Sequence, residues 1–248
     1  MSAMAMKKIN PVQQPEPTHA PQRKIVIAVD GPAASGKGTL AKKMADRLGY
    51  AYLDTGALYR AVAFATLELG GDPSKSEDVK PALAIIRRNL TPELLANPAL
   101  RSHNVSEAAS KVAVLAEVRA GLVGYQREFA KNPPGNVGGA VLDGRDIGTV
   151  ICPDADLKFF VTATPEERAR RRFDELKTRY PELTPEKVLR DIRQRDQRDS
   201  GREMAPALAA HDACILDTTR MNPSEALQEA FALIRSKLPV ASNAAVHK

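Results

Sequence analysis

A glycine-rich segment with a single lysine, at 31–39, constrains the fold of this chain more than any other feature. It reads GPAASGKGT and matches the pattern G-x-x-x-x-G-K, with the threonine one place later than in the strict motif. The run IVIAV at 25–29 is apolar without alternation, which is typical of a parallel strand buried on both faces. In the segment 36–48, apolar residues recur four apart, and Gly49 follows as a helix-ending residue. A strand, a glycine-rich loop and a helix in this order predict a phosphate-binding loop.

The residue types of this loop suit a nucleoside triphosphate. Glycines let the backbone approach phosphates closely, and N–H groups of the loop and the helix N-terminus supply positive potential. Lys37 can reach the β- and γ-phosphates, and Thr39 or Gly38 lies where ligands of magnesium and phosphate are expected. The predicted ATP-binding residues are Gly31, Pro32, Ala33, Ala34, Ser35, Gly36, Lys37, Gly38 and Thr39. The alternative is a glycine-rich turn with a chance lysine, and the loop alone does not say how the triphosphate is used.

Further apolar runs and helix start signals predict the rest of the fold. Buried strands are predicted at 51–53, 140–142, 157–161 and 213–216. Helix N-caps followed by proline stand at Thr91, Thr164, Thr184 and Asn222. Capping boxes are predicted at Thr164, with Glu167, and at Asn222, with Glu225. Strands that alternate with helices predict an α/β fold with a parallel sheet of about five strands, flanked by helices. The phosphate-binding loop then lies at the carboxyl edge of the first strand.

Composition and charge narrow the function classes. The chain has 36 basic and 30 acidic residues among 248 and a formal net charge of +6, which suits either nucleic-acid binding or arginines gathered around phosphates. Aromatic residues make up 4% and tryptophan is absent, which disfavours a module that stacks bases. The two cysteines, Cys152 and Cys214, form no disulfide framework and indicate a reducing cytoplasm. We expect no signal peptide and no membrane span.

The folded domain is predicted at 24–240. The segment 1–23 holds four prolines and three glutamines and too few apolar residues to pack, so we expect a disordered tail. A second short tail is expected at 241–248.

Several motifs, in order along the chain, resemble the cytidylate kinase family. They are LDTGALYR at 53–60, EAASKV at 107–112, VR at 118–119, DGRDIGTV at 143–150 and RDQRDSGR at 195–202. The resemblance covers nearly all of the predicted domain. It implies a cytoplasmic, Mg²⁺-dependent kinase that transfers the γ-phosphoryl group of ATP to CMP or dCMP in pyrimidine nucleotide metabolism. It also implies a monomer without nucleic-acid or membrane partners.

The resemblance further implies a subdomain that binds the nucleoside monophosphate (NMP), at about 55–135, and a mobile lid at about 164–202. The CMP phosphate would be held by Arg60, Arg145 and Arg202. The cytosine would be read by Ser110, Arg119 and Asp146, and the sugar contacted by Arg195 and Asp199. The same pocket would be lined by Thr55, Gly56 and Tyr59. The implied catalytic residues are Lys37, Arg145 and Arg195.

These residue types make independent chemical sense. Guanidinium groups grip phosphate bidentately, a carboxylate such as Asp146 suits the N4 amino donor of cytosine, and Arg119 suits its N3 acceptor. Asp146 could instead cap a turn without contacting a base. Asp143 either caps a turn or binds magnesium through water. The residues Arg195, Asp199 and Arg202 share one helix face, where such a set is often surface ion pairing.

The lid and the enzyme class also allow more than one interpretation. The arginines of the first lid helix either serve the lid or form a solvated helix face: Arg168, Arg170, Arg171 and Arg172.

A regulatory GTPase would need a guanine-reading Asn-Lys-x-Asp segment, which the sequence lacks. Adenylate, shikimate and dephospho-coenzyme A kinases share the loop but not the segments 143–149 and 195–202 together. The segment 78–102 is shorter than in many cytidylate kinases and predicts helix and loop rather than strands.

Overall fold

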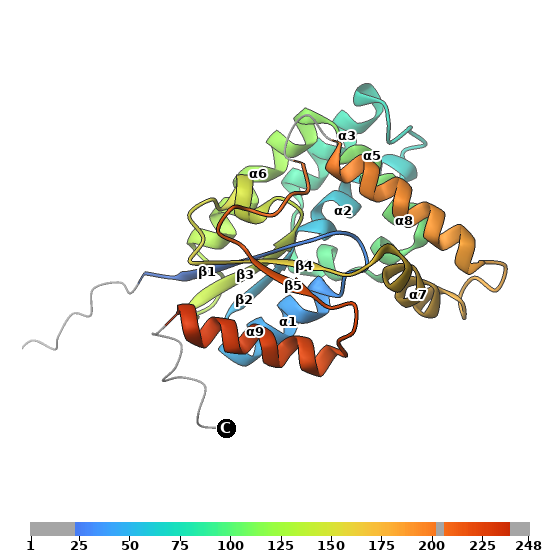
Figure 1. Ribbon diagram of the computed structural model, residues 1–248. Helices are drawn as coiled ribbons and strands as arrows, with labels where there is room; N and C mark the ends of the chain where they lie inside the picture. The colour runs from blue at the N-terminus through green and yellow to red at the C-terminus, as the bar shows by residue number, and fades with distance from the viewer. Residues whose placement is uncertain (1–22, 202–205, 239–248) are drawn as a thin grey trace, which may run out of the picture.

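A five-stranded parallel sheet forms the centre of the computed structural model, which describes residues 23–201 and 206–238 (Figure 1). The strand order is β2-β3-β1-β4-β5. The strands are β1 (Ile25–Asp30), β2 (Ala51–Asp54), β3 (Gly139–Gly144), β4 (Leu157–Thr162) and β5 (Cys214–Asp217). All five predicted strands are therefore confirmed, with ends that differ by at most two residues, and so is the predicted α/β parallel-sheet fold.

The central position of β1 explains its unbroken apolar sequence. The strand pairs with β3 on one side and with β4 on the other, and Ile27, Ala28 and Val29 are fully buried. Because all strands are parallel, their carboxyl ends meet at one edge of the sheet. The register sets Asp54 beside Asp143 and Asp30 beside Gly144, so three strand ends deliver polar groups to one place.

Helices cover both faces of the sheet (Figure 1). On one face, α1 (Lys37–Leu48) and α9 (Pro223–Lys237) pack in the largest apolar cluster, through side chains such as Met44 and Phe231. On the other face, α6 (Ala116–Lys131) and a single π-helical turn, η2 (Ile147–Ile151), pack against Ala28 and Leu142. None of the helices within the described ranges is long and apolar enough to cross a membrane.

A second helical cluster forms the region predicted to bind the NMP. It contains α2 (Thr55–Glu68), α3 (Ser76–Arg88), α4 (Pro92–Ala96), the 3₁₀ turn η1 (Pro98–Arg101) and α5 (His103–Val112). These helices pack with α6 around their own apolar core, which includes Leu58, Val62 and Leu122. The segment 78–102, which is described throughout, consists of helix and loop, as predicted.

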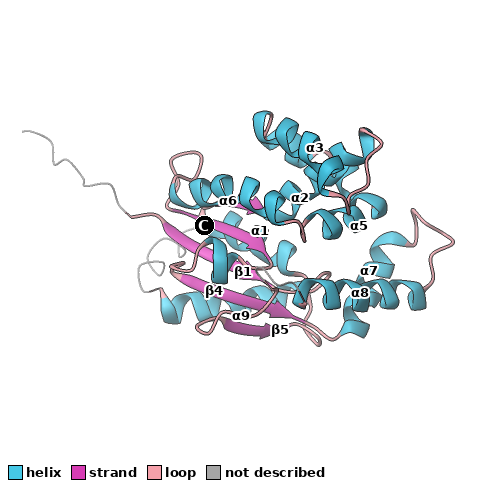
Figure 2. Cartoon of the chain, turned by 90° about the horizontal axis from the view of Figure 1, so that it is seen from above, coloured by secondary structure: helices cyan, strands magenta, loops and turns pink. Residues whose placement is uncertain are grey.

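Two helices lie beyond the carboxyl ends of the strands, in the segment predicted to form the lid (Figure 2). They are α7 (Pro165–Leu176) and α8 (Pro185–Ser200), and a small apolar cluster joins them to Ala33 of the phosphate-binding loop. Within the predicted lid segment of 164–202, α7 ends at Leu176 and α8 ends at Ser200. Arg202, at the end of the predicted lid, lies outside the described residues, as do residues 1–22 of the expected N-terminal tail and all of 241–248.

The four predicted N-caps are confirmed, but one capping box is wrong. The side chains of Thr91, Thr164, Thr184 and Asn222 all accept hydrogen bonds from the first turns of their helices. At Asn222, Glu225 completes the capping box. The Glu167 carboxylate instead accepts hydrogen bonds from Arg170 and Arg171, because charged donors bind a carboxylate more strongly than a backbone N–H group does. The Thr164 N–H donates to Thr219 Oγ1, 3.1 Å away.

Candidate active site

The loop after β1 has the backbone conformation that its glycines were expected to allow. Gly36, the N-cap of α1, has a φ of 85°, and Ala34 also has a positive φ of 59°. A Cβ on Gly31 would lie 2.0 Å from the carbonyl oxygen of Val161, so only glycine fits there. The loop thus turns tightly from β1 onto the N-terminus of α1, where backbone N–H groups without helical partners suit an anion.

The loop borders a cleft of about 990 Å³, a size that accommodates a nucleotide. Six of the nine predicted ATP-binding residues line it: Ala34, Ser35, Gly36, Lys37, Gly38 and Thr39. The other three, Gly31, Pro32 and Ala33, do not line this cleft. Gly31 packs against β4, and the Ala33 carbonyl accepts from Arg168 at 3.2 Å.

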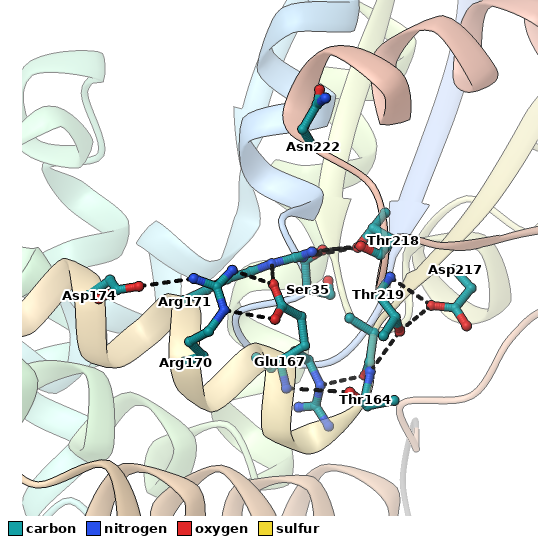
Figure 3. Close-up of polar contacts among 12 residues, drawn as sticks. Ser35, Thr164, Glu167, Arg170, Arg171, Asp174, Asp217, Thr218, Thr219 and Asn222 are labelled. Carbon is teal, nitrogen blue, oxygen red and sulfur yellow. Dashed lines mark hydrogen bonds and ion pairs between the residues drawn. The ribbon is translucent and has the colours of Figure 1, made fainter.

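Arginines of α7 also line the cleft, and Figure 3 shows the polar contacts of Arg170 and Arg171. Arg171 donates to the Thr218 carbonyl at 2.6 Å, to Thr218 Oγ1 at 3.0 Å and to the Ser35 carbonyl at 3.4 Å. It therefore links α7, the phosphate-binding loop and the loop after β5. Arg170 pairs with Glu167, and hydrogen bonds from Arg170 and Arg171 lower the pKa of that carboxyl to about 2.

The four arginines of α7 differ in their surroundings. Arg168 is buried and donates to both carboxylate oxygens of Asp196 on α8, at 3.0 and 2.6 Å, so it joins α7 to α8. Arg170, Arg171 and Arg172 line the cleft. The interpretation of this set as a solvated helix face is therefore wrong for Arg168 and for the half-buried Arg171.

A second, tighter pocket adjoins the cleft, and Lys37 and Asp54 line both. Ten of the eleven predicted CMP-binding residues line it: Thr55, Gly56, Tyr59, Arg60, Ser110, Arg119, Arg145, Asp146, Arg195 and Asp199. The eleventh, Arg202, lies outside the described residues. The ten come from α2, α5, α6, α8 and the turn after β3, so the fold gathers residues up to 144 positions apart, from Thr55 to Asp199.

Ion pairs organise the second pocket. Arg119 and Asp146 form a buried pair, and the Arg119 guanidinium also lies 5.9 Å from the ring centre of Tyr59. Asp199 accepts from Arg145 at 3.0 Å and lies 3.9 Å from Arg195. Asp199 is only 3% exposed, so its pair with Arg195 is not a surface pair. Burial and the nearby Arg145 lower the pKa of Arg195 to about 10.

Lys37 and Asp143 meet where the two pockets join, with Nζ 3.9 Å from Oδ1. Tyr52 Oη donates to Asp143 Oδ2 at 2.8 Å, and Thr55 Oγ1 donates to the Asp143 carbonyl at 2.7 Å. Burial raises the pKa of Asp143 and lowers that of Lys37 to about 8, the latter aided by Arg145. Asp143 therefore faces the loop lysine rather than capping a turn.

Comparison with known proteins agrees with this arrangement. The family model described as cytidylate kinase matches residues 27–236. This chain belongs to the cytidylate kinase family. A cytidylate kinase of Rhodospirillum rubrum is 51% identical over 213 residues, which cover 86% of this chain and 98% of that protein. One of Azorhizobium caulinodans is 51% identical over 210 residues, covering 85% and 98%.

One solved structure shows the same fold at low identity. The crystal structure of an uncharacterized protein from Eubacterium ventriosum superposes with a TM-score of 0.52 at 12% identity, over 86% of this chain and 99% of that one.

Kinases of this kind use a divalent cation, and the residues present fit one held mainly by phosphates and water. Within 23–201 and 206–238, no cluster of three or more His, Cys, Asp or Glu side chains could hold a metal ion. Magnesium in nucleotide sites commonly binds through one or two carboxylates, substrate phosphates and water. Asp143 supplies a buried carboxylate at the junction of the pockets, and the exposed Thr39 supplies a hydroxyl on the cleft wall.

Three residues of this family member were missed by the sequence reasoning. Asp54 caps α2 through Ala57 N at 3.1 Å, and its carboxylate lies 2.6 Å from Arg60. Its place directly after the predicted strand at 51–53 was an available N-cap signal, because Asp is a preferred N-cap residue. Arg198 donates to Ser110 Oγ at 2.7 Å. Asp30 accepts from the backbone N–H groups of residues 147 and 148, at 2.8 Å each, and so holds the turn that carries Arg145 and Asp146.

Proposed function

We propose that this chain transfers the γ-phosphoryl group of ATP to CMP or dCMP, giving ADP and CDP or dCDP. The observation that carries the proposal is the meeting of two pockets at Lys37 and Asp54, one beneath the phosphate-binding loop and the other rich in arginine. Phosphoryl transfer depends on bringing two anions into line and neutralising their charge, more than on covalent chemistry. Two adjoining basic pockets that share a lysine suit that task.

On the donor side, the loop backbone and Lys37 bind the triphosphate. The lysine lies at the junction of the pockets, so its charge acts between the β- and γ-phosphates and the acceptor. Arg170, Arg171 and Arg172 of α7 face the same cleft and hold the phosphates from the lid side. When bound, Mg²⁺ would neutralise phosphate charge, and Asp143 or Thr39 would hold it through water.

On the acceptor side, arginines bind the CMP phosphate and sugar. The buried Nε atoms of Arg60 and Arg195 have no hydrogen-bond partner among the described residues, which supports their pairing with an anionic ligand. Arg145 and Arg195 are drawn together by Asp199, so phosphate and sugar contacts lie side by side. Arg202 belongs to this proposal on the family pattern alone.

The base is read by the buried Arg119 and Asp146. Cytosine offers an acceptor at N3 and a donor at N4, which match a guanidinium and a carboxylate held next to each other. Removal of water from this pocket strengthens both contacts. A monomer that acts in the cytoplasm without nucleic acid remains part of the proposal.

The proposal is tested by coupled detection of ADP release with a panel of acceptors: CMP, dCMP, UMP and AMP. We expect kcat/KM to be highest for CMP and dCMP, and Lys37→Ala to lower kcat about 10²- to 10³-fold. A higher kcat/KM for UMP or AMP, or no release with any acceptor, would overturn it.

A further inference from the structure

One contact joins the lid to the helix that faces the base. Arg198 of α8 donates through Nη1 to Ser110 Oγ of α5, at 2.7 Å. Ser110 lines the second pocket and is only 2% exposed. Its hydroxyl in turn donates to the Glu107 carbonyl, one turn earlier on α5, at 2.8 Å.

These two hydrogen bonds fix what the Ser110 hydroxyl can still offer. A guanidinium only donates and a carbonyl only accepts, whereas a hydroxyl has one proton and two lone pairs. The Ser110 proton is therefore used on Glu107, and one lone pair is used on Arg198. One acceptor position remains. The Arg198 hydrogen bond also polarises the hydroxyl, which strengthens its bond to Glu107 and opposes rotation of the proton into the pocket.

The Arg198 guanidinium is itself held along α8, where Nε donates to the Gln194 carbonyl at 3.5 Å. Without this arginine, Ser110 is a helical serine with a single bond to its own helix, and its side chain is free to change rotamer. A freely turning hydroxyl serves as donor or acceptor and discriminates little between bases. A hydroxyl held as an acceptor favours a base that offers a donor at that position.

We propose that Arg198 is a positioning residue that holds Ser110 as a hydrogen-bond acceptor and thereby favours an amino group over a carbonyl at the base edge. The proposal rests on the proposed function, because cytosine and uracil differ there by an N4 amino group and an O4 oxygen. Since Arg198 lies on the lid and Ser110 on α5, the correct base and the closed lid stabilise each other. Selectivity is then partly a property of lid closure, as in induced fit.

The test measures kcat/KM for CMP and for UMP in Arg198→Ala, Ser110→Ala and the double variant. Loss of one hydrogen bond of this kind corresponds to about tenfold. We expect each single variant to lower the CMP/UMP ratio about tenfold, mainly by losing CMP activity, and the double variant to lower it no further than a single one. Arg198→Lys, which keeps a donor, should restore part of the ratio.

Arg193→Ala is the matched control. Arg193 lies on the same helix, and its exposed side chain pairs with an exposed glutamate on α7. Its removal should leave the ratio within about twofold, since exposed pairs contribute little. Melting temperatures of all variants separate selectivity from stability.

Three results would overturn the inference. One is an Arg198→Ala variant that loses CMP and UMP activity equally, which indicates a simple contact between helices. Another is a double variant whose losses multiply, because independent residues behave so. The third is a CMP/UMP ratio that is the same in the variants as in the wild-type enzyme, when the wild type clearly prefers CMP. A wild-type enzyme with no CMP preference would instead refute the proposed function, and this inference with it.

Discussion

The replacement of Asp146 by asparagine tests how the second pocket distinguishes cytosine from uracil. Asp146 and Arg119 are 5% and 7% exposed and paired with each other, so both act in a site from which water is largely excluded. A carboxylate accepts from the cytosine N4 amino group but faces a carbonyl oxygen in uracil. An asparagine amide both donates and accepts, so it can bond to either base.

The expected magnitude follows from the charge of the group removed. A hydrogen bond to a charged partner contributes about 1.5–3 kcal/mol, and about 1.4 kcal/mol corresponds to a factor of ten. We therefore expect Asp146→Asn to lower kcat/KM for CMP about 10- to 100-fold. The loss of kcat/KM for UMP should be much smaller, because the variant no longer sets a carboxylate against the carbonyl oxygen of uracil. The CMP/UMP ratio should fall at least about tenfold.

The assay compares kcat/KM for the two acceptors at saturating ATP, with the melting temperature measured alongside. Asp212→Asn is the matched control, because Asp212 pairs with the buried Lys158 at 2.9 Å and lines neither pocket. It should lower stability without changing the ratio. An unchanged CMP/UMP ratio in a well-folded Asp146→Asn enzyme would show that Asp146 does not read the base.

Three further predictions concern Lys37 and the lid. Lys37→Ala should lower kcat about 10²- to 10³-fold with the melting temperature nearly unchanged, as expected for loss of a charge that stabilises the transition state; wild-type turnover would refute the role. Because burial lowers the pKa of Lys37 to about 8, kcat/KM for ATP should decline as the pH rises above about 8. Its contribution to stability has the opposite trend: between about pH 8 and 10.5 the unfolded chain binds the proton more tightly, so this contribution increases with pH. A kcat/KM that stays flat to pH 10 would contradict the shift. ATP hydrolysis without CMP should be far slower than phosphoryl transfer, because lid closure over both substrates excludes water; hydrolysis at the full kinase rate would exclude this mechanism.

Local patterns were sufficient to predict most of the fold. The apolar run of β1 and the N-caps at Thr164 and Asn222 are signals within a few residues of the chain, and each is confirmed. The phosphate-binding loop was predictable for the same reason, because its glycines, its lysine and its flanking elements are contiguous.

Contacts that depend on how distant elements dock could not be predicted in this way. Arg168 and Arg170 stand two places apart in one helix, yet one is buried against α8 and the other is exposed. Asp30 ends a strand, and nothing near it in sequence shows that it holds the turn at 147–148. The capping box at Glu167 fails because arginines one turn later compete for its carboxylate. Partner choice among charged groups is thus decided by tertiary structure.

The most direct test of the central claim follows the phosphoryl group itself. The purified chain is incubated with Mg²⁺, CMP and ATP that carries a label in its γ-phosphate, and the products are separated. Our account predicts that the label appears in CDP, in proportion to the ADP formed. Omission of CMP should prevent the transfer, and Lys37→Ala should slow it about 10²- to 10³-fold. Label that appears as inorganic phosphate, or that stays in ATP while CMP is unchanged, would contradict it.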